Sequence, residues 1–351
     1  NLQIDVAVSG TASKRIVIQA ERPGEVVFDG FPQITISGDY ISLKDIIFKD
    51  GEAGIEIISD PSVWRELVLI KGNFNQLSGC LFDNFDRNPV FKNIRLLWVR
   101  LEGRSCRIDH NAFIGKRSKL NLLRTGGQVH AFNRIDHNYF NLFPGITHPI
   151  MIGSGWILNN ESHTVVEFNL FERCVGEIIS DKTSKNINRF NTFFNSAGAI
   201  SLRQGFNTHV YANYFIEDKT GHEVWSQKRI DHSLSVGVNV RLSGHLIENN
   251  LFNTYFPAVI LRSGAPEGFQ EPGRHRNLPR HYAPASNTLI RQNTIISRNT
   301  AFVIEPAKEA TDVKNRIQLA SDITIRDNLI VNESSTKLFD IDKKEQLVFQ
   351  D

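Results

Sequence analysis

Two cationic residues, Lys182 and Arg203, stand 21 residues apart at comparable points of successive β-rich segments, residues 177–182 and 201–205. Neighbouring cations repel, and each lowers the tendency of the other to hold its proton. A structural protein gains little from such a pair. An enzyme that acts on a polyanion gains a charge that attracts the substrate and a lysine closer to the neutral amine of a general base.

A recurring pattern of Asn, any residue, then Phe or Ile indicates the elements that position this pair. Successive asparagines are separated by 27, 31, 22, 22, 37, 43 and 35 residues. Periods of this size are typical of stacked repeats, in which each unit buries its apolar face only against its neighbours. A coil of about 22 residues of alternating β sequence fits three strands and three turns. We therefore predict an all-β, right-handed parallel β-helix, with Lys182 and Arg203 on adjacent strands about 4.8 Å apart.

The repeated asparagines are expected at tight turns, because asparagine tolerates left-handed backbone and its amide bonds the main chain. Stacked coils would align these amides into an asparagine ladder, and the Phe or Ile two residues on would stack in the core. We interpret these residues as architecture. The repeated asparagines are Asn111, Asn138, Asn169, Asn191, Asn213, Asn250, Asn293 and Asn328.

The whole chain, residues 1–351, is predicted to be one domain, because no linker separates the repeats. Residues 1–30 would cap or begin the helix. The longer spacings indicate two loop insertions, residues 217–232 and 263–286. Long excursions on a rigid repeat scaffold usually build a binding site.

Composition excludes several classes of protein. The formal net charge is +2, with 40 basic and 38 acidic residues, so nucleic acid is not an expected partner. No apolar run reaches the roughly 18 residues of a membrane span. The cysteines Cys80, Cys106 and Cys174 have no metal-like spacing and are expected to be buried as small apolar side chains.

Three segments around the cation pair and two framework segments carry a resemblance to a known family. These segments are residues 177–182, 202–205, 237–241, 134–140 and 163–172. They resemble polysaccharide lyase family 6, the alginate lyases and chondroitinase B, and the likeness covers essentially the whole chain. The resemblance implies β-elimination on a uronate, with Lys182 as the base that removes the C5 proton. Arg203 is then the acid, or the stabiliser, at the departing glycosidic oxygen.

Members of this family commonly neutralise the substrate carboxylate with a calcium ion held by one Asn and two Glu residues. Glu177 matches one Glu, Val175 replaces the other, and the Asn falls on Gly145 in an ungapped alignment. Calcium requires six to eight oxygen ligands. We therefore predict a calcium-independent lyase without a metal or other cofactor.

Neutralisation would then fall to water or to a side chain such as Arg241, Lys116 or Arg262. Arg241 could clamp the carboxylate with its bidentate fork, and Glu177 could orient Lys182 or Arg203. The residues predicted to bind substrate are Arg241, Lys116, Glu177, Gln204, Arg262 and Arg274.

The resemblance favours alginate as the substrate, with dermatan sulfate or chondroitin as the alternative. A hydrolase needs two or three carboxylates at one site, and we expect no Asp–Asp pair at adjacent coils. A non-catalytic polysaccharide-binding β-helix would need neither Lys182 nor Arg203. The family, and a chain whose only Met is Met151, imply a secreted or periplasmic protein. The sequence does not distinguish mannuronate from guluronate preference, endo from exo cutting, or the oligomeric state.

Overall fold

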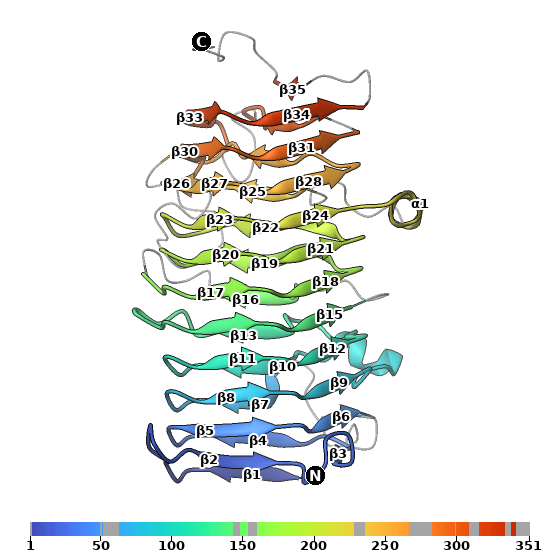
Figure 1. Ribbon diagram of the computed structural model, residues 1–351, viewed down its shortest axis with the longest axis vertical. Coiled ribbons are helices and arrows are strands. Elements are labelled where there is room, and N and C mark those ends of the chain that lie inside the picture. The colour runs from blue at the N-terminus through green and yellow to red at the C-terminus, as the bar shows by residue number, and fades with distance from the viewer. Residues whose placement is uncertain are drawn as a thin grey trace.

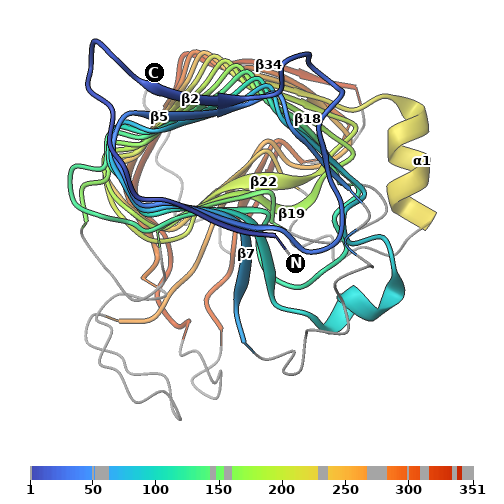
Figure 2. The same cartoon turned by 90° about the horizontal axis from the view of Figure 1, so that it is seen from below.

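Short alternating strands wind into successive coils in the computed structural model, and equivalent strands of neighbouring coils pair in parallel (Figure 1). Most coils contribute one strand to each of three sheets (Figure 2). The inward side chains of the coils form one core. This is the all-β parallel β-helix that the repeat predicts. The structure describes residues 2–49, 51, 63–142, 148–153, 160–227, 236–266, 283–298, 300–308, 316–333 and 338–341.

The sheets are numbered here in the order in which each coil visits them, over the described part of the chain. The first has 12 strands, β1 (Gln3–Val6), β4 (Gln33–Ile36), β7 (Arg65–Ile70), β10 (Leu96–Leu101), β13 (Leu123–Thr125), β16 (Ile150–Ile152), β19 (Val175–Asp181), β22 (Ala197–Leu202), β25 (Val238–Val240), β29 (Val259–Leu261), β32 (Phe302–Ile304) and β35 (Phe339–Asp340). The second has 12 strands, β2 (Ile16–Gln19), β5 (Ile41–Lys44), β8 (Gln76–Ser78), β11 (Arg107–Asp109), β14 (Arg134–Asp136), β17 (Val165–Glu167), β20 (Ile187–Arg189), β23 (His209–Tyr211), β27 (Leu246–Glu248), β30 (Ala285–Arg291), β26 (Leu242–Ser243) and β33 (Ser321–Arg326). The third has 11 strands, β3 (Val27–Phe28), β6 (Ile47–Lys49), β9 (Leu81–Asp83), β12 (Ala112–Ile114), β15 (Tyr139–Asn141), β18 (Leu170–Glu172), β21 (Thr192–Phe194), β24 (Tyr214–Ile216), β28 (Leu251–Thr254), β31 (Thr294–Ser297) and β34 (Leu329–Asn332).

The predicted asparagine ladder is confirmed, and it runs along the corner between the second and third sheets. From Asn111 to Asn328, each amide Nδ2 donates to the Oδ1 of the asparagine in the next coil, at 2.9–3.0 Å. Two residues on, the phenylalanines of the repeat stack in the core from Phe113 to Phe252, with ring centroids 4.6–5.0 Å apart. Both ladders hold the coils in register.

The left-handed backbone falls one residue before each ladder asparagine, which corrects the expectation that the asparagine itself adopts it. The residues before Asn111, Asn138 and Asn191 have φ of 56°, 54° and 53°. The asparagine can then remain in the strand direction while its amide bonds to main-chain carbonyls as well as to its neighbour. The turn geometry and the ladder amide are therefore supplied by different residues.

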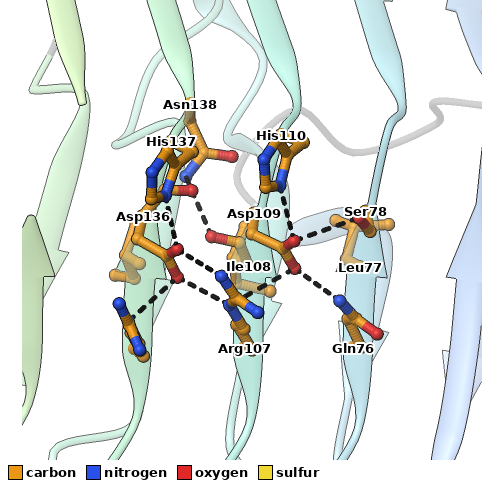
Figure 3. Close-up of polar contacts among 12 residues, drawn as sticks. Gln76, Leu77, Ser78, Arg107, Ile108, Asp109, His110, Asp136, His137 and Asn138 are labelled. Carbon is orange, nitrogen blue, oxygen red and sulfur yellow. Dashed lines mark hydrogen bonds and ion pairs between the residues drawn. The ribbon is translucent and has the colours of Figure 1, made fainter. Parts of the chain in front are cut away.

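The outer face of the second sheet carries a polar ladder beside this corner (Figure 3). Arg107 donates from Nε and Nη2 to the two oxygens of Asp136, at 2.8 and 2.6 Å. His110 and His137 each bond the preceding aspartate, Asp109 or Asp136, at 2.8 Å, and their rings stack with centroids 5.0 Å apart. These contacts join adjacent coils and give both histidines an architectural role. They also correct the expectation of no Asp–Asp pair at adjacent coils, because Asp109 stands opposite Asp136. Both carboxylates are engaged within the ladder.

Residues 217–232, predicted to be a polar loop, contain the helix α1 (Lys219–Gln227), which lies outside the coils (Figure 2). A second short helix, the 3-10 helix η2 (Pro89–Asn93), leads into β10. Of the other insertion, residues 267–282 lie outside the described residues, and its last residues already belong to β30. No helix in the described ranges is long and apolar enough to cross a membrane.

The first coil begins at the N-terminal end of the chain. Strands β1, β2 and β3, all within residues 3–28, pair in register with β4, β5 and β6 of the following coil. Each sheet therefore starts in the segment for which a cap or a first coil is expected. The treatment of residues 1–351 as a single domain stays a prediction.

Candidate active site

Four cationic residues follow the first sheet at the same level of four successive coils. Each one donates its main-chain N–H to the last strand residue of the preceding coil, at 2.9 or 3.0 Å. These residues are Lys182, Arg203, Arg241 and Arg262. The parallel register of β19, β22, β25 and β29 thus sets the four positive residues side by side along the helix axis. The expectation that Lys182 and Arg203 lie one coil apart is confirmed.

The surroundings of Lys182 lower the pKa of its ammonium group. Burial, followed by the charge of Arg203, lowers the pKa of its ammonium to about 8, against the opposing influence of Glu177. A lysine with this pKa is partly neutral near physiological pH, whereas an exposed lysine is almost fully charged. The site therefore contains an amine that can accept a proton.

Arg203 is fixed by Glu177 from the start of β19. Its Nη1 donates to both carboxylate oxygens at 3.0 Å, and Ser180 donates to one of them at 2.7 Å. Burial raises the pKa of Glu177, but the charges of Arg203 and His148 outweigh it, so this pKa lies below its ordinary value. Glu177 thus stays ionised and orients Arg203, which was one of the roles expected for it.

His148, which lies just before β16, also belongs to the site. The pairing of Ile150 with Ile179, continued backwards, sets His148 opposite Glu177. Its Nδ1 accepts the main-chain N–H of Glu177 at 3.1 Å. Burial and the charges of Arg203 and Lys182 hold its pKa below the ordinary value for histidine. Sequence reasoning missed this residue, because its segment carries no repeat signature and only the strand pairing places it opposite Glu177.

Asp181, the last residue of β19, is buried and links the coils that carry Lys182 and Arg203. Its main-chain carbonyl accepts the N–H groups of Arg203 and Gln204 at 2.9 and 3.1 Å. Its carboxylate, 1% exposed, accepts the Asn186 amide at 2.7 Å and the Thr208 hydroxyl at 3.4 Å. Burial raises the pKa of Asp181 to about 7. This buried group fixes the turn that carries Lys182.

Arg241 and Arg262 continue the cationic column but differ in their neighbours. Arg241 donates from Nη1 to the Ser263 carbonyl at 3.0 Å, and burial lowers its pKa to about 10. Arg262 is 9% exposed, donates to Asn239 at 2.8 Å and lies 3.5 Å from Glu305. Glu305 interacts electrostatically with both arginines, so both positive charges lie close to a carboxylate of the protein.

The expectation that Lys116 binds substrate is wrong. Lys116 lies on the connection from the third sheet to the first, whereas Lys182 lies on the connection from the first sheet to the second. Its side chain is 0% exposed, and Nζ donates to both oxygens of Ser118, with Asp86 at 3.8 Å. It is a buried structural lysine, so a polysaccharide cannot reach its charge.

Gln204 and Arg274 were also expected to bind substrate. Gln204 is 2% exposed, so its side chain is shielded, and its main chain serves the turn at Asp181. Arg274 lies outside the described residues. Arg124 in β13, which sequence reasoning missed, pairs with Met151 on the outer face of the first sheet and contributes to lowering the pKa of Lys182. Its guanidinium lies 4.8 Å from the centre of the Trp64 ring.

The place of one implied calcium ligand is occupied by an apolar cluster. Val175 stands where the resemblance implies a carboxylate, and it is 1% exposed. It packs against Ala197 and against Val224 and Trp225 of α1. Trp225 also donates from its indole N–H to the Asn195 carbonyl at 2.8 Å, which anchors the helix there. The unpredicted helix therefore forms a hydrophobic wall at this point.

The other two positions at which the resemblance implies calcium ligands do not complete a calcium site. Both oxygens of Glu177 are engaged by Arg203, and one of them also by Ser180. Gly145, onto which the Asn ligand falls, lies outside the described residues. One charge-balanced carboxylate beside a hydrophobic wall lacks the oxygen-rich shell that calcium requires. The described residues do not fit the ion.

Comparison with known proteins agrees with this fold. The family model described as Chondroitinase B matches residues 1–351, and no curated protein matches the sequence. Among solved structures, a mannuronic acid specific family 6 lyase from human gut microbiota is 24% identical, with a TM-score of 0.67 over 93% of this chain and 74% of its own. A family 6 lyase from Pseudopedobacter saltans is 18% identical, with a TM-score of 0.74 over 97% and 92%. A family 6 alginate lyase complexed with a trisaccharide is 20% identical, with a TM-score of 0.72 over 95% and 71%. This chain belongs to the Chondroitinase B family and is a polysaccharide lyase of family 6.

Proposed function

We propose that this lyase cleaves alginate by β-elimination, with Lys182 as the base and Arg203 at the leaving group. The observation that carries the proposal is the pair itself. Lys182 has its pKa lowered to about 8 beside an arginine that Glu177 locks in place. A base and a fixed cation on adjacent coils provide the two groups that the reaction needs at neighbouring atoms.

The neutral amine of Lys182 takes the C5 proton of a uronate residue. The electron pair of the broken C–H bond first spreads into the adjacent carboxyl group and then forms the C4–C5 double bond. The bond from C4 to the glycosidic oxygen breaks, and its electron pair leaves with that oxygen. The Arg203 guanidinium stabilises the negative charge on the oxygen, which takes up a proton from water. Lys182 then releases the C5 proton to water and returns to the neutral amine.

Alginate is favoured because solved relatives that share the fold include an alginate lyase complexed with a trisaccharide. The cationic residues Arg124, Arg203 and Arg241 suit a polymer with one carboxylate on every sugar. Dermatan sulfate is the second candidate, since the matching family model is described as Chondroitinase B. Both polymers are extracellular, and on this ground we also propose that the protein is secreted.

The direct test is to incubate the purified protein with alginate and, separately, with dermatan sulfate, and to record ultraviolet absorbance. The C4–C5 double bond of the new chain end absorbs, whereas the product of hydrolysis does not. We expect absorbance to rise with alginate. New reducing ends without absorbance would contradict the elimination, and binding without any cleavage would support a polysaccharide-binding β-helix instead.

Variants assign the two roles. Lys182→Ala should lose activity by about 1,000-fold or more, because no other described amine can replace it at C5. Arg203→Ala should lose about 100-fold or more in kcat, because the leaving oxygen is no longer stabilised. Lys44→Ala, which removes a lysine from β5 in the second sheet, is the matched control and should retain activity. Equal activity in Lys182→Ala and the control would exclude Lys182 as the base.

A further inference from the structure

An elimination at C5 requires that the uronate carboxylate lose its negative charge while the proton leaves. The described residues do not fit a calcium ion, so this role falls to water or to a protein side chain. His148 lies opposite Glu177 in the extended register of β16 and β19, and it is electrostatically coupled to Lys182 and Arg203. Its side chain is a partly exposed hydrogen-bonding group close to the pair.

The hydrogen bond to Glu177 defines the form of the imidazole ring. Because Nδ1 accepts the Glu177 N–H at 3.1 Å, Nδ1 must carry a lone pair and no proton. A charged imidazolium has protons on both nitrogens and could not accept this bond. The neutral ring therefore carries its proton on Nε2, and burial together with the charges of Arg203 and Lys182 favours the same neutral form.

The ring has a fixed place and one unused donor. The Nδ1 and Cε1 atoms lie against Gly176, where an added Cβ would meet them at 3.5 and 3.6 Å. The main chain of residues 176 and 177 thus holds one edge of the ring. Within the described ranges, Nε2 has no hydrogen-bond partner, and the residue is partly exposed. One edge is anchored, and the other is available to a ligand.

We propose that the Nε2–H of His148 donates to the carboxylate of the uronate that Lys182 deprotonates, in place of a metal ion. This inference rests on the lyase function proposed above. The hydrogen bond strengthens as negative charge moves from C5 into the carboxyl group, so it lowers the barrier more than it tightens substrate binding. His148 keeps its proton throughout the cycle and needs no titration.

The experiment compares two polymers that differ only in the charge of the carboxyl group, namely alginate and alginate esterified at its carboxyl groups. An ester is already neutral and needs no donor to neutralise it. With His148→Ala, we expect kcat on alginate to fall about 100-fold and the loss on the ester to be at least about tenfold smaller. His148→Gln, whose amide can accept from Glu177 and donate to the substrate, should recover part of the lost activity. A purely architectural histidine would give the same loss on both polymers and no such rescue.

A second measurement is independent of turnover. Nitrogen-15 NMR of the wild-type protein labelled at histidine should show a neutral His148 ring with its proton on Nε2. A proton on Nδ1, a charged ring, or His148→Ala with undiminished activity on alginate would overturn the inference while the lyase function stands. A wild-type protein that forms no unsaturated product from either alginate or dermatan sulfate would contradict both the lyase function and the role of His148. If the wild type does not cut the ester, the NMR result and the glutamine rescue decide.

Discussion

Nη1 of Arg203 donates to both carboxylate oxygens of Glu177, at 3.0 Å each, across adjacent coils of the first sheet. The ion pair orients the cation at the leaving group. It also places a negative charge near Lys182, which raises the pKa of the lysine against the larger effect of burial. Glu177 therefore has two opposing effects on catalysis, because it organises the site but holds the base closer to its charged form.

The pH profile should reflect this balance. The base is active only as the neutral amine, so kcat/KM of the wild type should rise with pH through about 8, the pKa of Lys182, and then level off. Glu177→Gln removes the charge that favours the protonated lysine, so the rise should move to lower pH. The plateau should fall by about tenfold or more, because Arg203 loses its anchor. An unchanged midpoint in Glu177→Gln would mean that the titrating group is not Lys182.

Metal removal should leave the activity intact. Val175 is buried against Trp225, and Arg203 balances the negative charge of Glu177 in an ion pair. The described residues therefore offer calcium no adequate shell of oxygen ligands. We expect dialysis against a chelator to change kcat by less than about twofold, and added calcium to have no effect. A calcium-dependent enzyme treated in the same solution serves as the positive control. Loss of activity on chelation, with recovery on adding calcium, would contradict this prediction.

The sequence was sufficient for the fold because the repeat has a local cause. Each ladder asparagine marks one turn, and the phenylalanine two residues later marks one strand. Their spacing of 22 residues in the shortest coils equals the length of one coil. The same spacing placed Lys182 beside Arg203. The spacing did not reveal which residue of each turn adopts the left-handed conformation. The residue before the asparagine adopts it, and the asparagine amide can still form its hydrogen bonds.

The site was only partly predictable, because burial is a tertiary property. Lys116 looked like a groove lysine in a basic stretch, yet its ammonium is enclosed with Ser118 and Asp86. His148 lies in a segment without a repeat signature, and only the pairing of β16 with β19 brings it to Glu177. Helix α1 was predicted to be part of a polar loop. Its sequence is mostly polar, and the two apolar residues that pack on Val175 are Val224 and Trp225.

Lys116 should matter for stability and not for catalysis. It is fully buried 3.8 Å from Asp86, and removing one member of a buried ion pair leaves the other uncompensated. We expect Lys116→Met to lower the free energy of unfolding by about 3 kcal/mol or more, as measured by urea denaturation. The kcat of the folded variant should match the wild type within about twofold. The control is Lys119→Met, which alters an exposed lysine of the same segment. A Lys116 variant of normal stability but raised KM would restore it as a substrate contact.

Asp181 should make stability depend on pH. Burial raises its pKa from 3.8 to about 7, so the native protein binds this proton more tightly than the unfolded chain does. The stabilisation from that proton is complete below about pH 3.8 and is lost progressively as the pH rises to about 7.

Asp181→Asn keeps the shape and the capacity to hydrogen-bond but cannot ionise. We therefore expect its free energy of unfolding to vary less between pH 4 and pH 7 than that of the wild type. At pH 8 it should be the more stable of the two by more than about 1 kcal/mol, because no buried carboxylate has to be charged. Urea denaturation at pH 5 and pH 8 measures both quantities. Asp29→Asn, at an exposed aspartate, is the control. A variant with the same pH slope as the wild type would show that Asp181 is already ionised in the core, held by Asn186 and Thr208.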